Sequence, residues 1–311
     1  MKAVVVKEAG GRAELTEFPT PEPGPGQIRV RLAAAGVNPV DGKTASAAYG
    51  EASYPFVPGT DGAGTVDLVG PAVTSFSPGD RVFGRLQLAR WRGTYAEYTL
   101  APADGVIARL PPGLDFVTAA ALPVAGVTAM GVLEELGLEP GAALFVLGAT
   151  GGVGGFLTQL AALEGIVVVA TADSSLAPRM QALGATHTLD HHSSEPLLNQ
   201  VRAVRPEGID ALADLVGDPA TLQPLLELLP RGEVVLSTAQ EIEQELLSAR
   251  GLSGGRYRSQ PTAEMLKELG RLVAEGKVKV PLERVLPLAQ GPEVLTESTS
   301  HLHGKTVLTI P

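Results

Sequence analysis

The sequence predicts an α/β protein of two domains, one rich in short β-strands and one with a doubly wound parallel sheet. Its 311 residues exceed the length at which a single hydrophobic core usually stops growing. To about residue 114, turns rich in Pro and Gly separate short runs of Val, Ile and Leu, which predicts a small β-barrel-like domain. From about residue 115, strands alternate with helices, which predicts a parallel sheet covered on both faces.

Strong turn signals bound the elements expected in the first domain. The runs 28–32, 65–69 and 81–83 are expected strands, separated by turns such as "PTPEPGPGQ" and "SFSPGDRV". One helical stretch, 116–137, is expected before the strand 144–147. Further expected elements are the strands 144–147, 167–171, 186–190, 209–215 and 233–237, the helices 152–164 and 261–275, and closing strands of the first domain within 277–288 and 304–310.

The composition excludes several classes of function. A net charge of −10 and the absence of a basic run argue against nucleic acid or an anionic membrane as a partner. The chain has no cysteine, and therefore no disulfide, thiolate metal ligand or cysteine nucleophile. The first ten residues include Lys2 and Lys7 and no apolar signal core, and no apolar run reaches the roughly 20 residues of a membrane span. We therefore expect a cytoplasmic protein.

The stretch "GATGGVGGF", residues 148–156, predicts a phosphate-binding loop. It follows an expected strand, opens an expected helix, and fits G-x-G-x-x-G with Ala149 in place of the first glycine. Gly151 would let the backbone approach a pyrophosphate, and Gly154 would permit close packing of the helix. The expected cofactor contacts are the N–H groups at the positive end of this helix, which belong to Thr150, Gly151, Gly152, Val153 and Gly154. A glycine turn without a ligand is the alternative.

The strand 167–171 bears on the choice of dinucleotide. Enzymes that prefer NAD end this strand with an acid that binds the ribose, whereas this strand ends at Thr171. Ser174, Arg179 and His191 suit a 2′-phosphate, so we expect NADPH rather than NADH. Asp173 would repel that phosphate by about 3 kcal/mol at about 5 Å and a dielectric constant of ~20, unless it points away. The alternative interpretation of Arg179 and His191 is a solvated surface.

Nine stretches of the chain, in their order and spacing, carry a resemblance to a known family. They are "AAAGVNPVDGK" (33–43), "PFVPGTDGAGTVDLVG" (55–70), "SPGDRVFG" (77–84), "GTYAEYTL" (93–100), "AALPVAGVTA" (120–129), "GATGGVG" (148–154), "QALGATHTLDH" (181–191), "RGEVVLSTA" (231–239) and "HGKTVLTI" (303–310). Together they resemble the medium-chain dehydrogenase/reductase superfamily, and specifically its zinc-free quinone oxidoreductase branch. The resemblance implies a GroES-like catalytic domain, 1–118 completed by 256–311, and a Rossmann dinucleotide-binding domain, 119–255.

The resemblance also implies chemistry without zinc. The positions that hold the metal in zinc-dependent relatives correspond to Asn38, Thr60 and Asp61, and neither Asn38 nor Thr60 offers a thiolate or an imidazole. Oxidising an alcohol relies on a Lewis acid to stabilise an alkoxide. Hydride transfer to a quinone or an α,β-unsaturated carbonyl needs only hydrogen-bond donors, because the product charge is delocalised. A small quinone or enone is therefore the expected substrate.

Three residues are the catalytic candidates that the resemblance implies. Asn38 would lie at the nicotinamide end of the cleft, and Thr60 would line the same pocket. Tyr49, eleven residues after Asn38, would donate a hydrogen bond or a proton to the developing oxyanion. The alternatives are a turn residue for Asn38 and a packing aromatic for Tyr49. Asp41 and Asp61 are expected to be structural and to bind backbone amides near glycine turns.

Two further residues are expected to contact the cofactor. The resemblance implies that Thr128, in "GVTA", binds the nicotinamide or its ribose, with a threonine inside a helix as the alternative. Ser237, the last residue of the expected strand 233–237, is also expected to bind the cofactor. Many similar proteins pair two subunits through a sheet edge of the nucleotide domain, so a homodimer is expected. The alternative functions are reduction of an enoyl thioester or alkenal double bond, and NADPH binding without catalysis.

Overall fold

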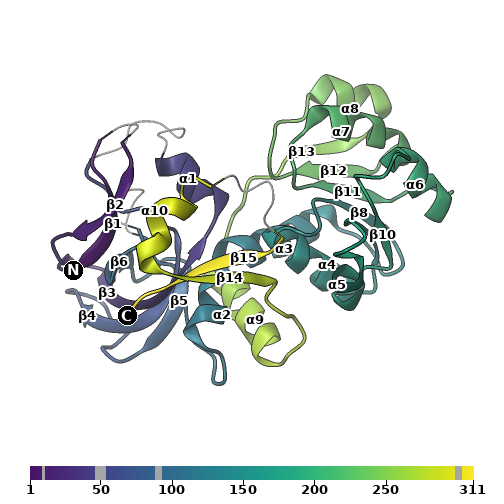
Figure 1. Ribbon diagram of the computed structural model, residues 1–311. Helices are drawn as coiled ribbons and strands as arrows, with labels where there is room; N and C mark the ends of the chain where they lie inside the picture. The colour runs from purple at the N-terminus through teal and green to yellow at the C-terminus, as the bar shows by residue number, and fades with distance from the viewer. Residues whose placement is uncertain (9–10, 46–53, 88–92, 298–302) are drawn as a thin grey trace. The chain divides into compact units, whose positions relative to one another are not determined.

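The computed structural model describes residues 1–8, 11–45, 54–87, 93–297 and 303–311. The chain divides into two compact units, Met1–Val127 with Pro261–Pro311 and Thr128–Gln260. The first unit is therefore built from both ends of the chain and the second from its middle, as the colours of Figure 1 show. Within the described residues, the helices are all too short or too polar to cross a membrane.

The first unit is a β-rich domain around one curved sheet. Its strands follow the order β14–β15–β3–β4–β5–β7, with β6 also paired to β3, and β1 and β2 form a separate pair. All of these pairs are antiparallel except β14 with β15. The strands are β1 (Lys2–Val6), β2 (Ala13–Glu17), β3 (Gln27–Val37), β4 (Asp61–Val69), β5 (Arg81–Arg85), β6 (Tyr98–Pro102), β7 (Ile107–Arg109), β14 (Leu282–Pro287) and β15 (Lys305–Thr309).

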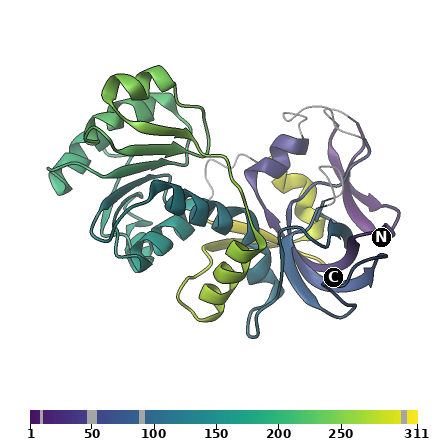
Figure 2. The same cartoon turned by 180° about the vertical axis from the view of Figure 1, so that it is seen from behind.

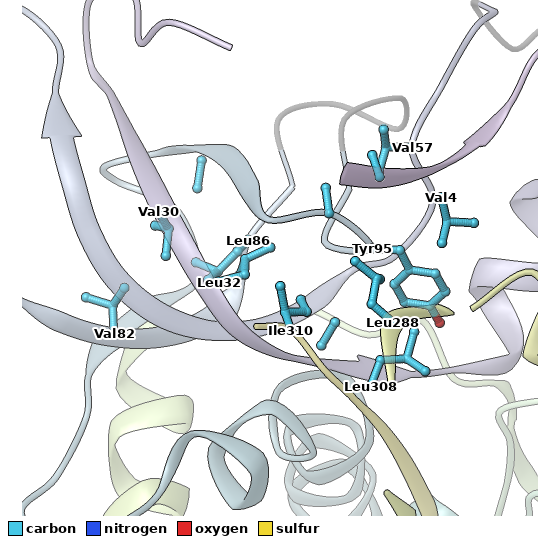
Figure 3. Packing of buried hydrophobic residues seen from close by; sticks show 14 of the residues in the cluster. Val4, Val30, Leu32, Val57, Val82, Leu86, Tyr95, Leu288, Leu308 and Ile310 are labelled. Atoms are coloured by element: carbon cyan, nitrogen blue, oxygen red, sulfur yellow. The ribbon is translucent and has the colours of Figure 1, made fainter. Parts of the chain in front are cut away.

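The core of the first unit gathers side chains from both ends of the chain. Figure 3 shows Tyr95 among Val4, Leu288 and Leu308, and all four side chains are buried. In β3, buried residues alternate with more exposed ones over the first eight positions, as expected for a strand with one face on a core. Each fully buried aliphatic side chain contributes about 1.5–3 kcal/mol, so the C-terminal strand is part of the domain's stability.

The predicted helical stretch 116–137 is wrong as one helix. It is two helices, α2 (Phe116–Ala120) in the first unit and α3 (Pro123–Leu136), which continues past Val127 into the second unit. The break comes at Pro123, which has no N–H to donate and whose ring bars the residue before it from continuing a helix. The first unit also contains the α-helices α1 (Pro39–Ala45), α9 (Ala263–Ala274) and α10 (Gly291–Val294).

The second unit is a doubly wound Rossmann-type domain, which confirms the predicted α/β fold. Its strands follow the order β10–β9–β8–β11–β12–β13, and all neighbours are parallel. Figures 1 and 2 show helices packed along these strands. The elements are β8 (Ala143–Leu147), β9 (Val167–Thr171), β10 (His187–Leu189), β11 (Ala211–Asp214), β12 (Val234–Ser237), β13 (Ser253–Arg256), α4 (Gly152–Leu163), α5 (Ala177–Ala182), α6 (Leu197–Val204), α7 (Pro219–Leu225) and α8 (Gln244–Arg250).

The strand order of the second unit reverses at β8, and this reversal positions the nucleotide loop. The strands β9 and β10 lie in sequence order on one side of β8. The strands β11, β12 and β13 lie in sequence order on the other side of β8. Right-handed crossovers in opposite directions place α4 and α5 on one face and α7 and α8 on the other. The loops that leave β8 and β11 separate at this point, and ligands bind at such a crevice in open parallel sheets. All five residues of β8 are buried.

Candidate active site

The glycine loop of the second unit is held by a threonine from the next strand. Gly148, directly after β8, has φ of +86°, a conformation that favours glycine. Its N–H donates to Thr171 Oγ1 at 2.8 Å, and the Ala149 N–H points to the same oxygen at 3.4 Å. Thr171 is the last residue of β9, and its hydroxyl donates to Val146 O at 3.3 Å. NAD-preferring enzymes carry an acidic residue at the end of this strand, whereas the hydroxyl of Thr171 here fixes the glycine loop.

The glycines of the loop leave room for a phosphate on one side and for a helix on the other. A Cβ on Gly151 would meet nothing nearer than Gly148 O at 3.5 Å, which is ordinary contact. A Cβ on Gly154 would collide with the backbone of Gly148 and Ala149, so Gly154 lets α4 pack directly on the loop. Thr150 and residues 151–153 are partly exposed, whereas Gly154 is buried.

The first turn of α4 is open to an anion. Gly151 is its N-cap and has no side chain to bind the first N–H groups. Those N–H groups carry the positive end of a 12-residue helix dipole. Open amides, a glycine that admits close approach and a helix N-terminus together fit the pyrophosphate of a nicotinamide dinucleotide.

The residues predicted to select the dinucleotide lie after β9 and β10. These strands are parallel neighbours, so the segments that leave their carboxyl ends share one edge of the sheet. Ser174 and His191 are exposed there, and Arg179 is half-buried on α5. Asp173 Oδ1 accepts from the N–H groups of Ser175 and Leu176, at 2.8 and 3.1 Å. One oxygen of this carboxylate is thus occupied by its own turn.

Two more predicted cofactor residues have different environments. Ser237 ends β12 and is fully buried, and its Oγ donates to Asp214 Oδ2 at 2.7 Å. The same Oγ accepts from the N–H groups of Ala239 and Gln240, each at 3.2 Å. Ser237 therefore shapes the loop after β12, and its contact with a cofactor stays a prediction. Thr128 is a partly exposed residue inside α3.

Asn38 belongs to a buried polar cluster in the first unit. It lies between β3 and α1 and is 4% exposed. Its Nδ2 donates to Asp61 Oδ2 at 2.9 Å, and its Oδ1 accepts from Lys305 Nζ at 2.6 Å. Asp61 also accepts from the N–H of Val124, at 3.1 Å. The amide of Asn38 is thus fixed in one orientation, with an ammonium at one end and a carboxylate at the other.

Lys305 is the residue of this cluster that sequence reasoning missed. It is the first residue of β15, is 3% exposed, and also donates to Val37 O at 2.8 Å. Burial lowers the pKa of Lys305, and the negative charges of Asp61 and Asp41 act in the opposite direction. The sequence around it reads as a strand, and nothing local distinguishes this lysine from an exposed one.

Asp41 connects the rest of the cluster. It is buried on α1, and its Oδ2 accepts from the N–H of Asn38 at 2.8 Å and the hydroxyl of Tyr95 at 3.1 Å. Its Oδ1 accepts from Thr60 Oγ1 at 3.1 Å. Burial, followed by the nearby charge of Asp61, raises the pKa of Asp41 to about 7. Burial likewise raises the pKa of Tyr95 and of Asp61.

The donor set of this cluster does not fit zinc. The resemblance implies that Asn38, Thr60 and Asp61 occupy the metal-binding positions of zinc-dependent relatives, and here these residues bring an amide, a hydroxyl and one carboxylate. The ammonium of Lys305 is already hydrogen-bonded to Asn38 and would repel a divalent cation. No group of three or more His, Cys, Asp or Glu that suits a metal occurs among the described residues. Tyr49, the third predicted catalytic residue, lies outside them.

The chain is similar to known dehydrogenases over its whole length. The family described as "Alcohol dehydrogenase GroES-like domain" matches residues 24–112, and the one described as "Zinc-binding dehydrogenase" matches 183–308. A quinone oxidoreductase from Lama guanicoe is 32% identical, over 99% of this chain and 97% of the relative.

Two solved structures have the same fold throughout. The quinone oxidoreductase of Escherichia coli, complexed with NADPH, superposes with a TM-score of 0.90 at 25% identity, and 100% of each chain is covered. A structure described as an NAD-dependent alcohol dehydrogenase gives a TM-score of 0.88 at 31% identity, again over 100% of both chains.

The raised pKa of Asp41 predicts a pH-dependent stability. A carboxyl whose pKa is higher in the folded state contributes fully below its unfolded pKa, near 4, and this contribution is lost as the pH rises through about 7. In Asp41→Asn, the new amide mimics the neutral acid and can donate to Thr60, whose hydroxyl can turn to Gln87 Oε1, 3.3 Å away. We expect this variant to lose less free energy of unfolding than the wild type between about pH 5 and about pH 8, measured by urea denaturation.

Asp218→Asn is the control for this measurement. Asp218 caps α7, and its hydrogen bonds with Thr221 and Ala220 lower its pKa, so it titrates below that window. Its substitution should leave the slope of stability against pH unchanged. Parallel pH profiles for the wild type and Asp41→Asn would show that Asp41 does not titrate in this range.

Proposed function

Because the chain belongs to the medium-chain dehydrogenase/reductase superfamily, in its quinone oxidoreductase branch, we propose that it reduces quinones or α,β-unsaturated carbonyls with NADPH and without zinc. It is an oxidoreductase enzyme that uses a nicotinamide cofactor. The observation that carries the proposal is the buried cluster of Asn38, Asp61 and Lys305, which supplies hydrogen bonds and an ammonium at the place of a metal. Such a site suits an acceptor whose reduced form spreads its negative charge.

The proposed mechanism divides the work between the two units. In the second unit, the N–H groups of Gly152 and Val153 hold the pyrophosphate, while the Gly151 N–H donates to Gly148 O within the loop, and Thr128 binds the nicotinamide or its ribose. The bound dinucleotide supplies the hydride. In the first unit, Asn38 donates a hydrogen bond to the acceptor oxygen as negative charge develops there, and Thr60 lines the same pocket. Tyr49 is the proposed proton donor to that oxygen.

Three observations support NADPH rather than NADH. The strand β9 ends in Thr171, whose hydroxyl is committed to the glycine loop. Asp173 is tied to its own turn, which lessens its repulsion of a 2′-phosphate. Ser174, Arg179 and His191 follow the two strands that border this part of the sheet edge. One solved structure similar to this chain is described as an NAD-dependent alcohol dehydrogenase, so the affinities for NADPH and NADH must both be measured.

A homodimer is part of the proposal. The parallel sheet of the second unit ends in β10 on one side and β13 on the other. An edge strand leaves N–H and C=O groups available for pairing with a second chain. Size-exclusion chromatography with light scattering tests this, and a monomer at micromolar concentration would contradict it.

The assay of the proposed reaction follows NADPH absorbance. We expect turnover with 1,2-naphthoquinone or with a simple enone, because their reduced forms are delocalised anions that hydrogen bonds stabilise. Activity should be unchanged after dialysis against a chelator. Reduction of crotonyl-CoA alone would favour an enoyl-thioester reductase instead. NADPH binding without turnover of any acceptor would favour a non-catalytic role, and loss of activity on chelation would contradict zinc independence.

The glycine loop gives a matched pair of variants. A methyl group on Gly151 meets only ordinary contact within the protein, so Gly151→Ala should keep the free energy of unfolding within about 1 kcal/mol. It should nevertheless weaken NADPH binding at least tenfold, because the methyl group occupies the approach of the pyrophosphate. Gly154→Ala should instead destabilise the fold, since its methyl group meets backbone. Equal NADPH affinity of Gly151→Ala and the wild type, measured by fluorescence titration, would contradict this site.

Arg179 tests the choice of cofactor. A hydrogen bond to a charged group is worth about 1.5–3 kcal/mol, so Arg179→Gln should weaken NADPH binding about 10- to 100-fold and leave NADH binding nearly unchanged. Arg202→Gln is the control, since Arg202 is exposed on α6 and pairs with Glu227. If Arg179→Gln weakens both cofactors equally, this arginine does not recognise the 2′-phosphate.

A further inference from the structure

The side chain of Asn38 bridges two buried charges. Lys305 Nζ lies 2.6 Å from its Oδ1, and its Nδ2 lies 2.9 Å from Asp61 Oδ2. Lys305 and Asp61 form no direct ion pair within 4 Å among the described residues, so the amide connects them. All three side chains are buried. Their separation in sequence, 267 residues between Asn38 and Lys305, means that the fold alone creates this arrangement.

This arrangement polarises the amide in one direction. A positive charge at the oxygen favours the resonance form with a negative oxygen and a positive nitrogen, which strengthens both N–H groups as donors. Interactions of this kind are stronger in a buried site of low effective dielectric than in water. Asp61 takes one N–H of Asn38, and no described residue takes the other. In the proposed reaction, that second N–H is the one that donates to the acceptor oxygen.

We propose that Lys305 is a positioning residue that acts through Asn38, fixing its amide and making the second N–H a stronger donor to the acceptor oxygen. The buried ammonium thus supplies, through one side-chain amide, the positive charge that a metal ion supplies in zinc-dependent relatives. The inference rests on the proposed function, because the acceptor oxygen is that of the reaction assigned above. Its rival is a purely structural role, in which Lys305 only balances the charges of Asp41 and Asp61.

The chain offers a spectroscopic test that does not need activity. It contains two asparagines, Asn38 and Asn199, so labelling asparagine with ¹⁵N gives two side-chain NH₂ signal pairs. Asn199 is exposed on α6 and serves as the internal reference. We expect Lys305→Gln, which keeps a donor and removes the charge, to move the Asn38 protons upfield while the Asn199 signals stay in place. Unchanged Asn38 signals in a folded Lys305→Gln protein would overturn the polarisation.

A kinetic cycle tests the route through Asn38. Removing a donor to an oxyanion typically lowers kcat by about 10²–10³-fold, so removing its polarising charge in Lys305→Gln should lower kcat about tenfold or more. NADPH affinity should change less than twofold. Added to Asn38→Ala, the same substitution should cause no further loss in kcat. If Lys305→Gln lowers kcat by the same factor in the wild type and in Asn38→Ala, the proposal is overturned and the structural role of Lys305 remains.

Two controls separate the possible failures. Lys267→Gln changes a lysine that is 61% exposed on α9, and it should alter neither the Asn38 signals nor kcat. If Lys305→Gln is too unstable to study, Lys305→Met removes the charge at a similar side-chain length, and the Asn38 signals of that protein decide the same point. If the wild type reduces none of the acceptors, the proposed function fails, whereas the Asn38 signals still report whether Lys305 polarises the amide.

Discussion

The first unit depends on the charge and the hydrogen bonds of the Lys305 ammonium. Two carboxylates, Asp41 and Asp61, are buried there, and isolated buried charges cost several kcal/mol unless they are paired and hydrogen-bonded. Lys305 brings the opposite charge from the last strand of the chain, and Asn38 carries its effect to Asp61. Once this network forms, the orientations of Asn38 and Thr60 follow from it. The orientation of the Asn38 amide is therefore a consequence of how β15 pairs with β3.

In the second unit, polar side chains at the ends of strands bind the backbone of the adjoining loops. Thr171, Asp214 and Ser237 end the strands β9, β11 and β12 of the parallel sheet, and each hydrogen-bonds the backbone of a loop at the carboxyl edge. These loops are therefore shaped before any ligand arrives. What stays open is the first turn of α4, whose N-cap is a glycine. A rigid edge with one set of free amides is a suitable receptor for a phosphate-bearing cofactor.

The sequence predicts the second unit better than the first, for physical reasons. Buried parallel strands are continuous apolar runs, so β9 ends at Thr171 as predicted, and the glycine loop is a local pattern. The strand β13 was not predicted because its middle residues are Gly254 and Gly255, both at positive φ. Lys305 was missed because its role depends on partners from β3, α1 and β4. Similarly, only tertiary structure joins Tyr95 to Asp41, 54 residues apart.

The pairing of β15 with β3 also orders events during synthesis. The first unit needs residues 305–309 for its sheet, its core and the partner of its buried carboxylates. Residues 305–309 must therefore have left the ribosome before this unit can close, whereas residues 128–260, the whole of the second unit, emerge earlier. During that interval the unfinished sheet leaves the edge of β3 that pairs with β15 without its partner strand.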